Sequence, residues 1–412
     1  MLASLLIAAS LSPPPPVILS RTLDNGVRVV AERLPGSTRF SAQVLVRAGS
    51  VYETPETNGL NHLLEHMLFR GSSGLASGEA DRRAEAAGAT LNATTYREVV
   101  RFVCDGPNEA WKTGLDVVSL LVAEPALKPE HVRVEKGVVE EEIAYLRSDP
   151  ARLLNRSLWS RALTGDPLAL PTEGEPSALH GLSSQALLDL YRRHYGGENM
   201  VVAVVGDFDP SAALELAAER LGSLPRGAAG SPRRFPKFRP GRRAEDSPFR
   251  ESYAAFAFPA PGLGRPADYA AWEVLAQVLA GQYGRASAAG LEADSFYGPT
   301  EAGSLFTVIF SGTPEAEGLE AASLRLLRSL AEAGVTSQEA EDAKRRVAAL
   351  YGARRRDASH RAFLLSLYTL FATTDDLKSI EARIAGVTLE EVNVAARTMS
   401  PENAMVVVWR AR

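Results

Sequence analysis

The chain has 412 residues, of which 45% are hydrophobic, 23% charged and 7% aromatic, and its formal net charge is -5. This composition is that of a globular protein and excludes a collagen-like repeat or a largely disordered chain. The negative balance argues against a nucleic-acid partner. Cys104 is the one cysteine, so a metal site in this chain needs histidine and carboxylate ligands.

Residues 1–17 resemble a leader segment. The apolar run at 1–12 precedes four prolines and ends in small residues, but a basic start is missing. The run is shorter than the roughly 20 residues of a membrane-spanning helix, so we expect no transmembrane segment. If this segment is a signal peptide, the protein is periplasmic or secreted; otherwise it is cytoplasmic.

Strand and helix patterns alternate through residues 18–225. Alternating polarity at 26–32 and 42–48 predicts paired strands around a Leu-Pro-Gly-Ser turn that starts at Leu34. Apolar periodicity predicts helices over 59–69, 80–87, 107–122, 129–147 and 183–195. After Asn199 a valine-rich run reads as a buried strand.

The second half repeats this ending. Residues 226–247 are rich in Gly, Pro and Arg and are predicted to be a polar linker. In 248–412 we expect a strand at 253–258 and helices at 267–279, 315–333, 337–371 and 388–399, followed by Asn403 and a valine-rich strand. The fold class is therefore α+β: two homologous α/β sandwich domains, 18–225 and 248–412, each with helices on one sheet face.

The clearest chemical signal is the segment Gly-Leu-Asn-His-Leu-Leu-Glu-His, which starts at Gly59. His62 and His66 are four residues apart, so both imidazoles face one side of a helix and can share a zinc ion. Glu65 lies beside that face and can act as the general base on a water. Such a histidine pair can also be an ordinary surface feature, but this helix is apolar nearly all round and should be buried, where ionisable groups need partners.

A third zinc ligand is expected from the acidic run at 140–142. Glu135 lies two helical turns before Glu142, so the two carboxylates share a face. Glu142 as ligand is a coherent choice, with Glu135 joining Glu65 among the expected catalytic residues as an outer or electrostatic partner of the site. Spacing alone leaves Glu141 open, and without the histidine pair the run would read as a solvated face.

Together these segments resemble the pitrilysin/insulinase family of zinc peptidases, which includes the mitochondrial processing peptidases. The family pattern is matched by Ala-Gly-Ser-Val-Tyr-Glu ending at Glu53, by the His-x-x-Glu-His segment, by Gly-Ala-Thr-Leu-Asn-Ala ending at Ala93, and by the glutamates seven apart. The resemblance implies Glu142 as the third ligand. It also implies that Asn92 and Ala93 contact the backbone of a peptide that adds to a sheet edge, and that the chain is half of a four-domain clamshell.

The second half departs from the family pattern. A shift of 210 residues puts Trp272, Leu275 and Ala276 where the metal set would be, so one zinc per chain is expected. Active family members also carry an Arg and a Tyr there. Tyr297 remains as a candidate, but no arginine lies between Arg285 and Arg325.

We therefore expect a heterodimer in which a metal-free homologous subunit supplies the Arg/Tyr pair. A homodimer that uses Arg285 or Tyr283 is the alternative. The function expected is that of a zinc-dependent metalloendopeptidase acting on short or extended peptides, with Glu65 as general base. The alternatives are a non-catalytic scaffold or assembly subunit with the peptidase fold, and a zinc-binding module without turnover.

Overall fold

The computed structural model describes residues 17–231, 233–298, 300–311 and 316–411, so the leader predicted at 1–17 lies outside it except for Val17. The first half contains β1 (Val17–Thr22), β2 (Arg28–Arg33), β3 (Arg39–Val46), α1 (Leu60–Leu68), α2 (Glu79–Ala86), β4 (Thr90–Thr95), β5 (Val100–Pro107), α3 (Trp111–Leu121), α4 (Pro129–Leu146), α5 (Pro150–Ala162), α6 (Pro176–Leu179), α7 (Ser184–His194), β6 (Met200–Gly206) and α8 (Pro210–Leu221). The second half contains β7 (Gly241–Asp246), β8 (Tyr253–Pro261), α9 (Pro266–Leu279), α10 (Arg285–Ala288), β9 (Glu292–Tyr297), β10 (Gly303–Ser311), α11 (Ala316–Ala333), α12 (Ser337–Arg354), α13 (Ala358–Phe371), α14 (Thr374–Lys378), α15 (Ile380–Gly386), α16 (Leu389–Thr398) and β11 (Met405–Arg410).

The two halves contain the same sheet. The first sheet has the order β1-β2-β6-β3-β5-β4 and the second has β7-β11-β8-β10-β9. In each, one parallel pair (β2 with β6, β7 with β11) is followed by three antiparallel pairs. With β1 set aside, the strands correspond one to one, which confirms the duplicated α+β unit.

Each sheet is covered on one face by helices of its own half. Helices α3 and α8 contact the first sheet, and α11 and α9 contact the second. The central strands β6 and β11 are valine-rich because both of their faces are buried. This arrangement agrees with the expected α/β sandwiches.

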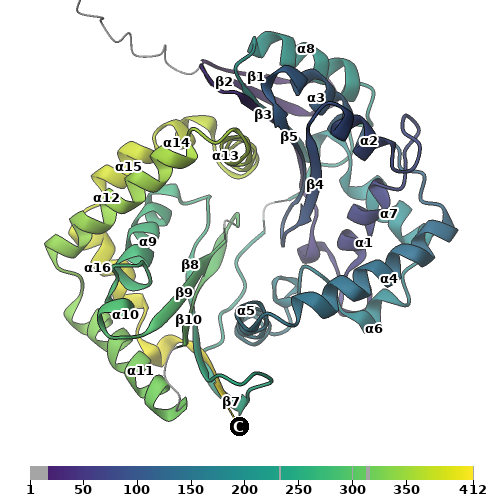
Figure 1. Ribbon diagram of the computed structural model, residues 1–412. Coiled ribbons are helices and arrows are strands. Elements are labelled where there is room, and N and C mark those ends of the chain that lie inside the picture. The colour runs from purple at the N-terminus through teal and green to yellow at the C-terminus, as the bar shows by residue number, and fades with distance from the viewer. Residues whose placement is uncertain (1–16, 232, 299, 312–315, 412) are drawn as a thin grey trace, which may run out of the picture.

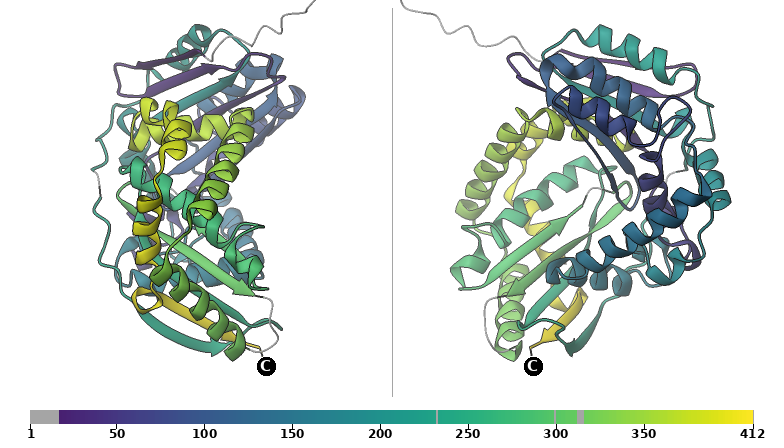
Figure 2. Two further views of the ribbon diagram at one scale, coloured as in Figure 1. Left: turned by 90° about the vertical axis from the view of Figure 1, so that its left-hand side faces the viewer. Right: turned by 45° about the vertical axis from the view of Figure 1, so that its right-hand side comes forward.

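The opposite face of each sheet is covered by a helix of the other half. Helix α5 packs on β8, β10 and β11, and α13 packs on β2, β3 and β6 (Figure 1). Leu154 and Leu158 of α5 share a core with Ala255 of β8. The two halves are therefore interlocked, and Figure 2 shows the resulting curved body from two further sides.

Strand β6 takes part in two cores, because side chains at alternate positions of a strand face opposite sides of the sheet. Val201 and Val205 share a core with Leu365 of α13. Val202 and Val204 belong to the core that α3 and α8 cover. The valines of β6 thus pack against α13 of the second half on one sheet face and against α3 and α8 of the first half on the other.

Three expectations from the sequence were wrong. The strands at 26–32 and 42–48 do not pair with each other, because β6 lies between β2 and β3 and pairs with both. The linker predicted at 226–247 contains β7, a polar edge strand that pairs with β11. The helix predicted at 337–371 is two helices, since Asp357 caps a new start for α13 with a hydrogen bond from the backbone N–H of His360.

Among the helices of the described ranges, none is both long and apolar enough to cross a membrane.

Candidate metal centre

Helix α1, which carries the histidine pair, is anchored at its N-terminus by a buried carboxylate. Glu53 accepts hydrogen bonds from the backbone N–H groups of Gly59 and Asn61, at 2.9 and 2.7 Å. It also accepts from the side-chain amides of Asn58 and Asn61, both at 2.8 Å. A carboxylate at this end of a helix satisfies free N–H groups and opposes the positive end of the helix dipole. The start of α1 is thus fixed in position.

Two glycines bring a second segment against the start of α1. Gly59 and Gly174 have φ values of 104° and 93°, in the left-handed region that favours glycine. A Cβ on Gly174 would lie 2.5 Å from the Cα of Gly59. This close approach lets the backbone carbonyl of Glu173 reach His62, at 3.1 Å from Nδ1.

The predicted ligands from α1 and α4 converge. Oε2 of Glu142 lies 3.3 Å from Nε2 of His66 and 3.6 Å from Nε2 of His62. One ligand atom from each of the three residues lies within 4.8 Å of the others. Glu141, the alternative from spacing, is exposed. The structure thus favours Glu142 over Glu141.

The geometry of these donors fits a zinc ion. Tetrahedral zinc ligands about 2.1 Å from the ion lie about 3.4 Å from one another, close to the distances from Glu142 to the two imidazoles. Two histidines and a carboxylate form a three-residue set that leaves one position open. The residues present therefore fit zinc.

Each histidine has a partner for its other ring nitrogen. Nδ1 of His62 can donate to the backbone carbonyl of Glu173, and Nδ1 of His66 lies 3.3 Å from Oε2 of Glu135. These partners orient both rings with Nε2 toward Glu142. Arg70 donates from Nε to the other oxygen of Glu135, at 2.5 Å. Glu135 thus contacts the ring of His66 on the side away from Glu142.

Glu65 is buried beside the ligands and does not join them. The hydroxyl of Thr95 donates to its Oε2 at 2.6 Å. Burial raises the pKa of the Glu65 carboxyl, and the nearby His62 and the Thr95 hydrogen bond oppose that rise. A carboxyl with a raised pKa at such a place is suited to accept and release a proton.

The ligands influence one another's protonation. Burial disfavours the charged form of His66, but the hydrogen bond with Glu142 and the charge of Glu65 outweigh it, so the pKa of His66 is raised. The hydrogen bond with His66 lowers the pKa of Glu142. Both shifts follow from the close contact between the His66 imidazole and the Glu142 carboxylate.

Strand β4 forms the free edge of the first sheet next to this site. Among the strands of the described residues it pairs with β5 alone, so its other side can accept another strand. Asn92 is exposed on this strand and its side-chain oxygen accepts a hydrogen bond from the N–H of Ala93, at 2.8 Å. Asn92 and Ala93 therefore lie where a peptide could pair, and Thr95 of the same strand contacts Glu65.

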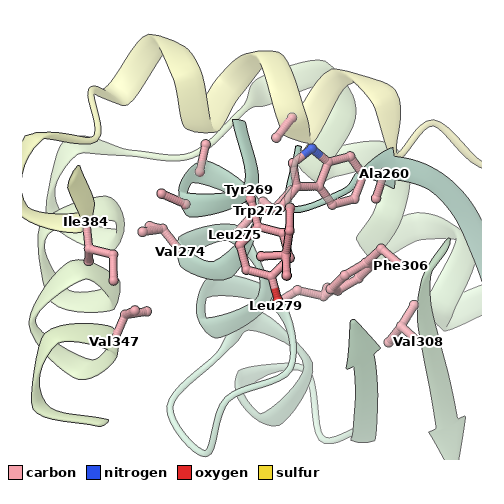
Figure 3. Packing of buried hydrophobic residues seen from close by; sticks show 14 of the residues in the cluster. Ala260, Tyr269, Trp272, Val274, Leu275, Leu279, Phe306, Val308, Val347 and Ile384 are labelled. Carbon is pink, nitrogen blue, oxygen red and sulfur yellow. The ribbon is translucent and has the colours of Figure 1, made fainter. Parts of the chain in front are cut away.

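The matching helix of the second half, α9, carries no ligands at the equivalent positions. Trp272 and Leu275 are buried in an apolar core with Phe306 and Val308, as Figure 3 shows. Ala276 packs against the same core. The second half thus uses the equivalent helix for packing, as the sequence predicted.

The candidates for an Arg/Tyr pair are engaged in the fold. Arg285 makes a bidentate ion pair with Glu339, with distances of 2.7 and 2.8 Å. The hydroxyl of Tyr297 donates to the carbonyl of Pro261 at 2.6 Å, and its ring stacks on Tyr269. Tyr283 is exposed. The side chains of Arg285 and Tyr297 are therefore held by contacts within the chain.

Sequence reasoning missed Thr95 and Glu173. Both reach the site through tertiary contacts, and neither stands at a spacing that identifies it. The glycine at 174 was a signal for close backbone approach next to Glu173, but it did not indicate the partner.

Comparison with protein families gives two matches that together span most of the chain. Residues 28–175 match the insulinase model of peptidase family M16, and residues 181–347 match the M16 inactive domain. The chain belongs to peptidase family M16. Its candidate metal residues all lie in the first match, and the metal-free α9 lies in the second.

Relatives in the M16 family carry different names. An uncharacterized zinc protease of Streptomyces coelicolor is 30% identical over 212 residues, which is 50% of this chain and 46% of that protein. Cytochrome b-c1 complex subunit 1 of Mus musculus is 29% identical over 204 residues, 50% of this chain and 42% of that one. The beta subunit of the mitochondrial processing peptidase of Caenorhabditis elegans is 28% identical over 212 residues, 52% of this chain and 46% of that one. The chain matches about half the length of these relatives.

A solved structure shares the whole fold. A protease from Helicobacter pylori superposes with a TM-score of 0.88, at 21% identity, over 96% of this chain and 99% of that one. The two-domain M16 fold is therefore confirmed over nearly the full length.

Proposed function

We propose that this chain is a zinc-dependent metalloendopeptidase that hydrolyses short or extended peptides. One observation carries the proposal: Nε2 of His62, Nε2 of His66 and an oxygen of Glu142 converge from two helices, and the buried Glu65 stands beside them without joining them. Membership of a peptidase family and a relative named as a zinc protease support it.

The roles of the residues follow from their contacts. His62, His66 and Glu142 would hold the ion, with Glu173 and Glu135 fixing the imidazoles. Bound zinc supplies a Lewis acid that lowers the pKa of a water and polarises a carbonyl. Glu65 takes the proton of the attacking water and passes it to the leaving amine.

Thr95 and the edge of β4 orient the reactants. The Thr95 hydroxyl holds Oε2 of Glu65, which leaves Oε1 for a water. A peptide that pairs with β4 is bound through its backbone more than its side chains, so a broad range of sequences can enter. Asn92 and Ala93 are assigned to substrate binding on this ground.

Metal content and cleavage together test the proposal. The purified chain is loaded with zinc and its metal is quantified. Cleavage of a quenched peptide is then followed for the wild type and Glu65→Gln, each with its partner subunit if one is required. The variant should retain zinc and lose about 10³-fold in kcat, the middle of the roughly 10²–10⁴-fold range for a lost general base. Cleavage by Glu65→Gln at the wild-type rate would remove Glu65 from its role, and a wild type that binds no zinc would overturn the proposal.

An assembly role is the second candidate, because relatives include a subunit of the cytochrome b-c1 complex. The complete ligand set favours catalysis, because burying ionisable groups costs folding free energy unless a metal or partner charges satisfy them. Zinc binding with no cleavage of any peptide, even with a partner present, would support the assembly role.

We also propose that the working enzyme is a heterodimer with a metal-free homologous subunit that supplies an Arg/Tyr pair. The engagement of Arg285 with Glu339 and of Tyr297 with Pro261 supports a partner's Arg/Tyr pair, whereas the exposed Tyr283 keeps the homodimer as the alternative. Full peptidase activity of the purified chain alone would exclude the heterodimer.

We propose that residues 1–17 determine where the protein is located. If they are removed as a signal peptide, the protein is exported to the periplasm or the medium. N-terminal sequencing of the protein isolated from its source cells tests this: an intact Met1 end would indicate a cytoplasmic protein.

A further inference from the structure

A cavity lined by arginines lies at the junction of α4 and α5. Its volume is about 140 Å³, and its lining includes Arg97, Arg147, Arg152, Arg156 and Glu173. A water takes about 30 Å³ of liquid volume, so the cavity has room for a carboxylate group. Nothing in the proposed mechanism uses these arginines.

The cavity adjoins the candidate metal centre through three of its walls. Arg147 follows α4 about one turn after Glu142, and Arg97 lies two residues after Thr95. Glu173, whose backbone carbonyl meets His62, forms the third wall. Segments that contribute residues to the metal centre therefore also contribute residues to the wall of the cavity.

The cavity carries an excess of positive charge. Arg156 pairs with Glu173 at 3.3 Å and with Glu175, and Arg147 pairs with Glu175 at 2.9 Å. Arg152 pairs with Asp149 at 3.5 Å, so four guanidinium groups meet three carboxylates at the cavity and its rim. An anion entering the cavity would meet unbalanced positive charge.

Arg97 has no carboxylate in contact among the described residues. Its guanidinium lies over the ring of Trp159, 3.9 Å from the centroid, and its Nε donates to the carbonyl of Leu168 at 3.1 Å. Burial lowers the pKa of Arg97 to about 10 and the charge of Glu173 opposes that shift, so the group remains charged at neutral pH. The half-buried guanidinium is held by a ring and a carbonyl, and a bound carboxylate would give it a direct ion pair.

We propose that this cavity is a subsite that binds a carboxylate of the peptide substrate, so that the enzyme prefers an acidic residue at a fixed distance from the scissile bond. The inference rests on the proposed function. Strand β4 ends at Thr95, and Arg97 follows in the turn that leads to β5. The cavity therefore lies beyond the end of the strand with which a peptide would pair, and the carboxylate belongs to the part of the peptide that continues past Thr95.

The test uses zinc-loaded protein, with its partner if one is required, and a family of quenched peptides. Each peptide carries Glu at one position and is compared with the same peptide carrying Gln there. We expect one position at which Glu raises kcat/KM about tenfold, in line with a hydrogen bond between charged groups at a partly exposed site. A matched peptide pair with a free or amidated carboxyl end distinguishes a side-chain carboxylate from a chain terminus.

Variants locate the effect. Arg152→Gln combined with Arg147→Gln should reduce the Glu preference to less than twofold while cleavage of the Gln peptide is retained. Arg152→Glu should favour Lys at that position, a reversal that a folding defect cannot produce. Arg397→Gln, which alters another exposed ion-paired arginine, should keep the wild-type preference.

The outcomes separate the two proposals. Equal cleavage of Glu and Gln peptides at every position would overturn the subsite and leave the peptidase intact. If no peptide is cleaved, the peptidase proposal fails, and anisotropy with labelled Glu and Gln peptides still decides the subsite. Equal binding of the two peptides, or no binding of either, would then overturn it.

Discussion

Nε2 of His66 lies 3.3 Å from Oε2 of Glu142, although α2, β4, β5 and α3 come between the two residues in the chain. This contact depends on the packing of α1 against α4. The same packing brings Glu135, two turns earlier on α4, to the other ring nitrogen of His66. One helix thus provides both a ligand and the residue that orients another ligand.

Glu142→Ala should abolish tight zinc binding, whereas Glu141→Ala should leave it unchanged. Glu142 contacts both imidazoles, and its neighbour Glu141 is exposed. Loss of a ligand should cost more than the roughly 10–100-fold in affinity that follows loss of an outer partner. Competition with a chromophoric chelator measures both affinities. Equal loss in the two variants would contradict the assignment.

Glu135→Gln should weaken zinc binding by about 10–100-fold, because His66 loses its charged partner. The matched control is Glu140→Gln on the same helix, which contacts His180 at the surface. At saturating zinc, the Glu135→Gln enzyme should recover most of its kcat. A kcat that stays low at saturation would place Glu135 in the reaction itself.

Thr95→Val should lower kcat by about tenfold or more without changing zinc content, because a hydrogen bond to a charged group contributes ~1.5–3 kcal/mol. Valine has nearly the shape of threonine but cannot donate to Glu65. Thr95→Ser keeps the hydroxyl and should keep most of the activity. If both variants behave alike, the hydroxyl is not what positions Glu65.

Arg361→Met should destabilise the fold by about 3–5 kcal/mol, the cost of leaving a buried charge unpaired. Nε of Arg361 on α13 lies 2.6 Å from Oε2 of Glu32 on β2, and both side chains are buried. Adding Glu32→Gln should recover part of the loss. The exposed pair Arg397–Glu390 is the control, and Arg397→Met should cost less than about 1 kcal/mol. Urea denaturation of the metal-free proteins measures each value.

Stability should fall between about pH 4.5 and 6 because of Glu98. Burial raises the pKa of this carboxyl from 4.5 to about 6, while the hydrogen bond from the backbone N–H of Glu301 opposes the rise. The folded state then binds more protons than the unfolded state in this range, so unfolding becomes easier as pH increases, by up to about 2 kcal/mol. Glu98→Gln should remove this slope. Parallel stability curves for variant and wild type would contradict it.

Local sequence patterns were enough to predict α1 and α4, and helical periodicity put His62 with His66 and Glu135 with Glu142 on shared faces. Periodicity left Glu141 open as a ligand; the family resemblance favoured Glu142, which the packing of α4 against α1 brings to the histidines. Thr95 and Glu173 could not be predicted, because each is positioned by contacts between distant segments. The bidentate engagement of Arg285 with Glu339 is likewise a tertiary contact.

Strand order was harder to predict than strand position. The turn after β2 suggested a hairpin with β3, but β6, which comes more than 150 residues later, takes the place between them. β7 was read as linker because it is polar and lies at a sheet edge, where charged residues are common.

Each half covers a sheet of the other half with one helix, α5 on the second sheet and α13 on the first. This exchange of helices determines how the protein can be divided. Either half made alone would leave an apolar sheet face open to water and would tend to aggregate. A chain cut in the segment before β7 would instead keep its fold. After such a cut α5 remains covalently attached to the first half and packed on the second sheet, and α13 remains attached to the second half and packed on the first sheet. Co-produced fragments 17–231 and 233–411 should therefore reassemble into one particle, whereas neither should be soluble without the other.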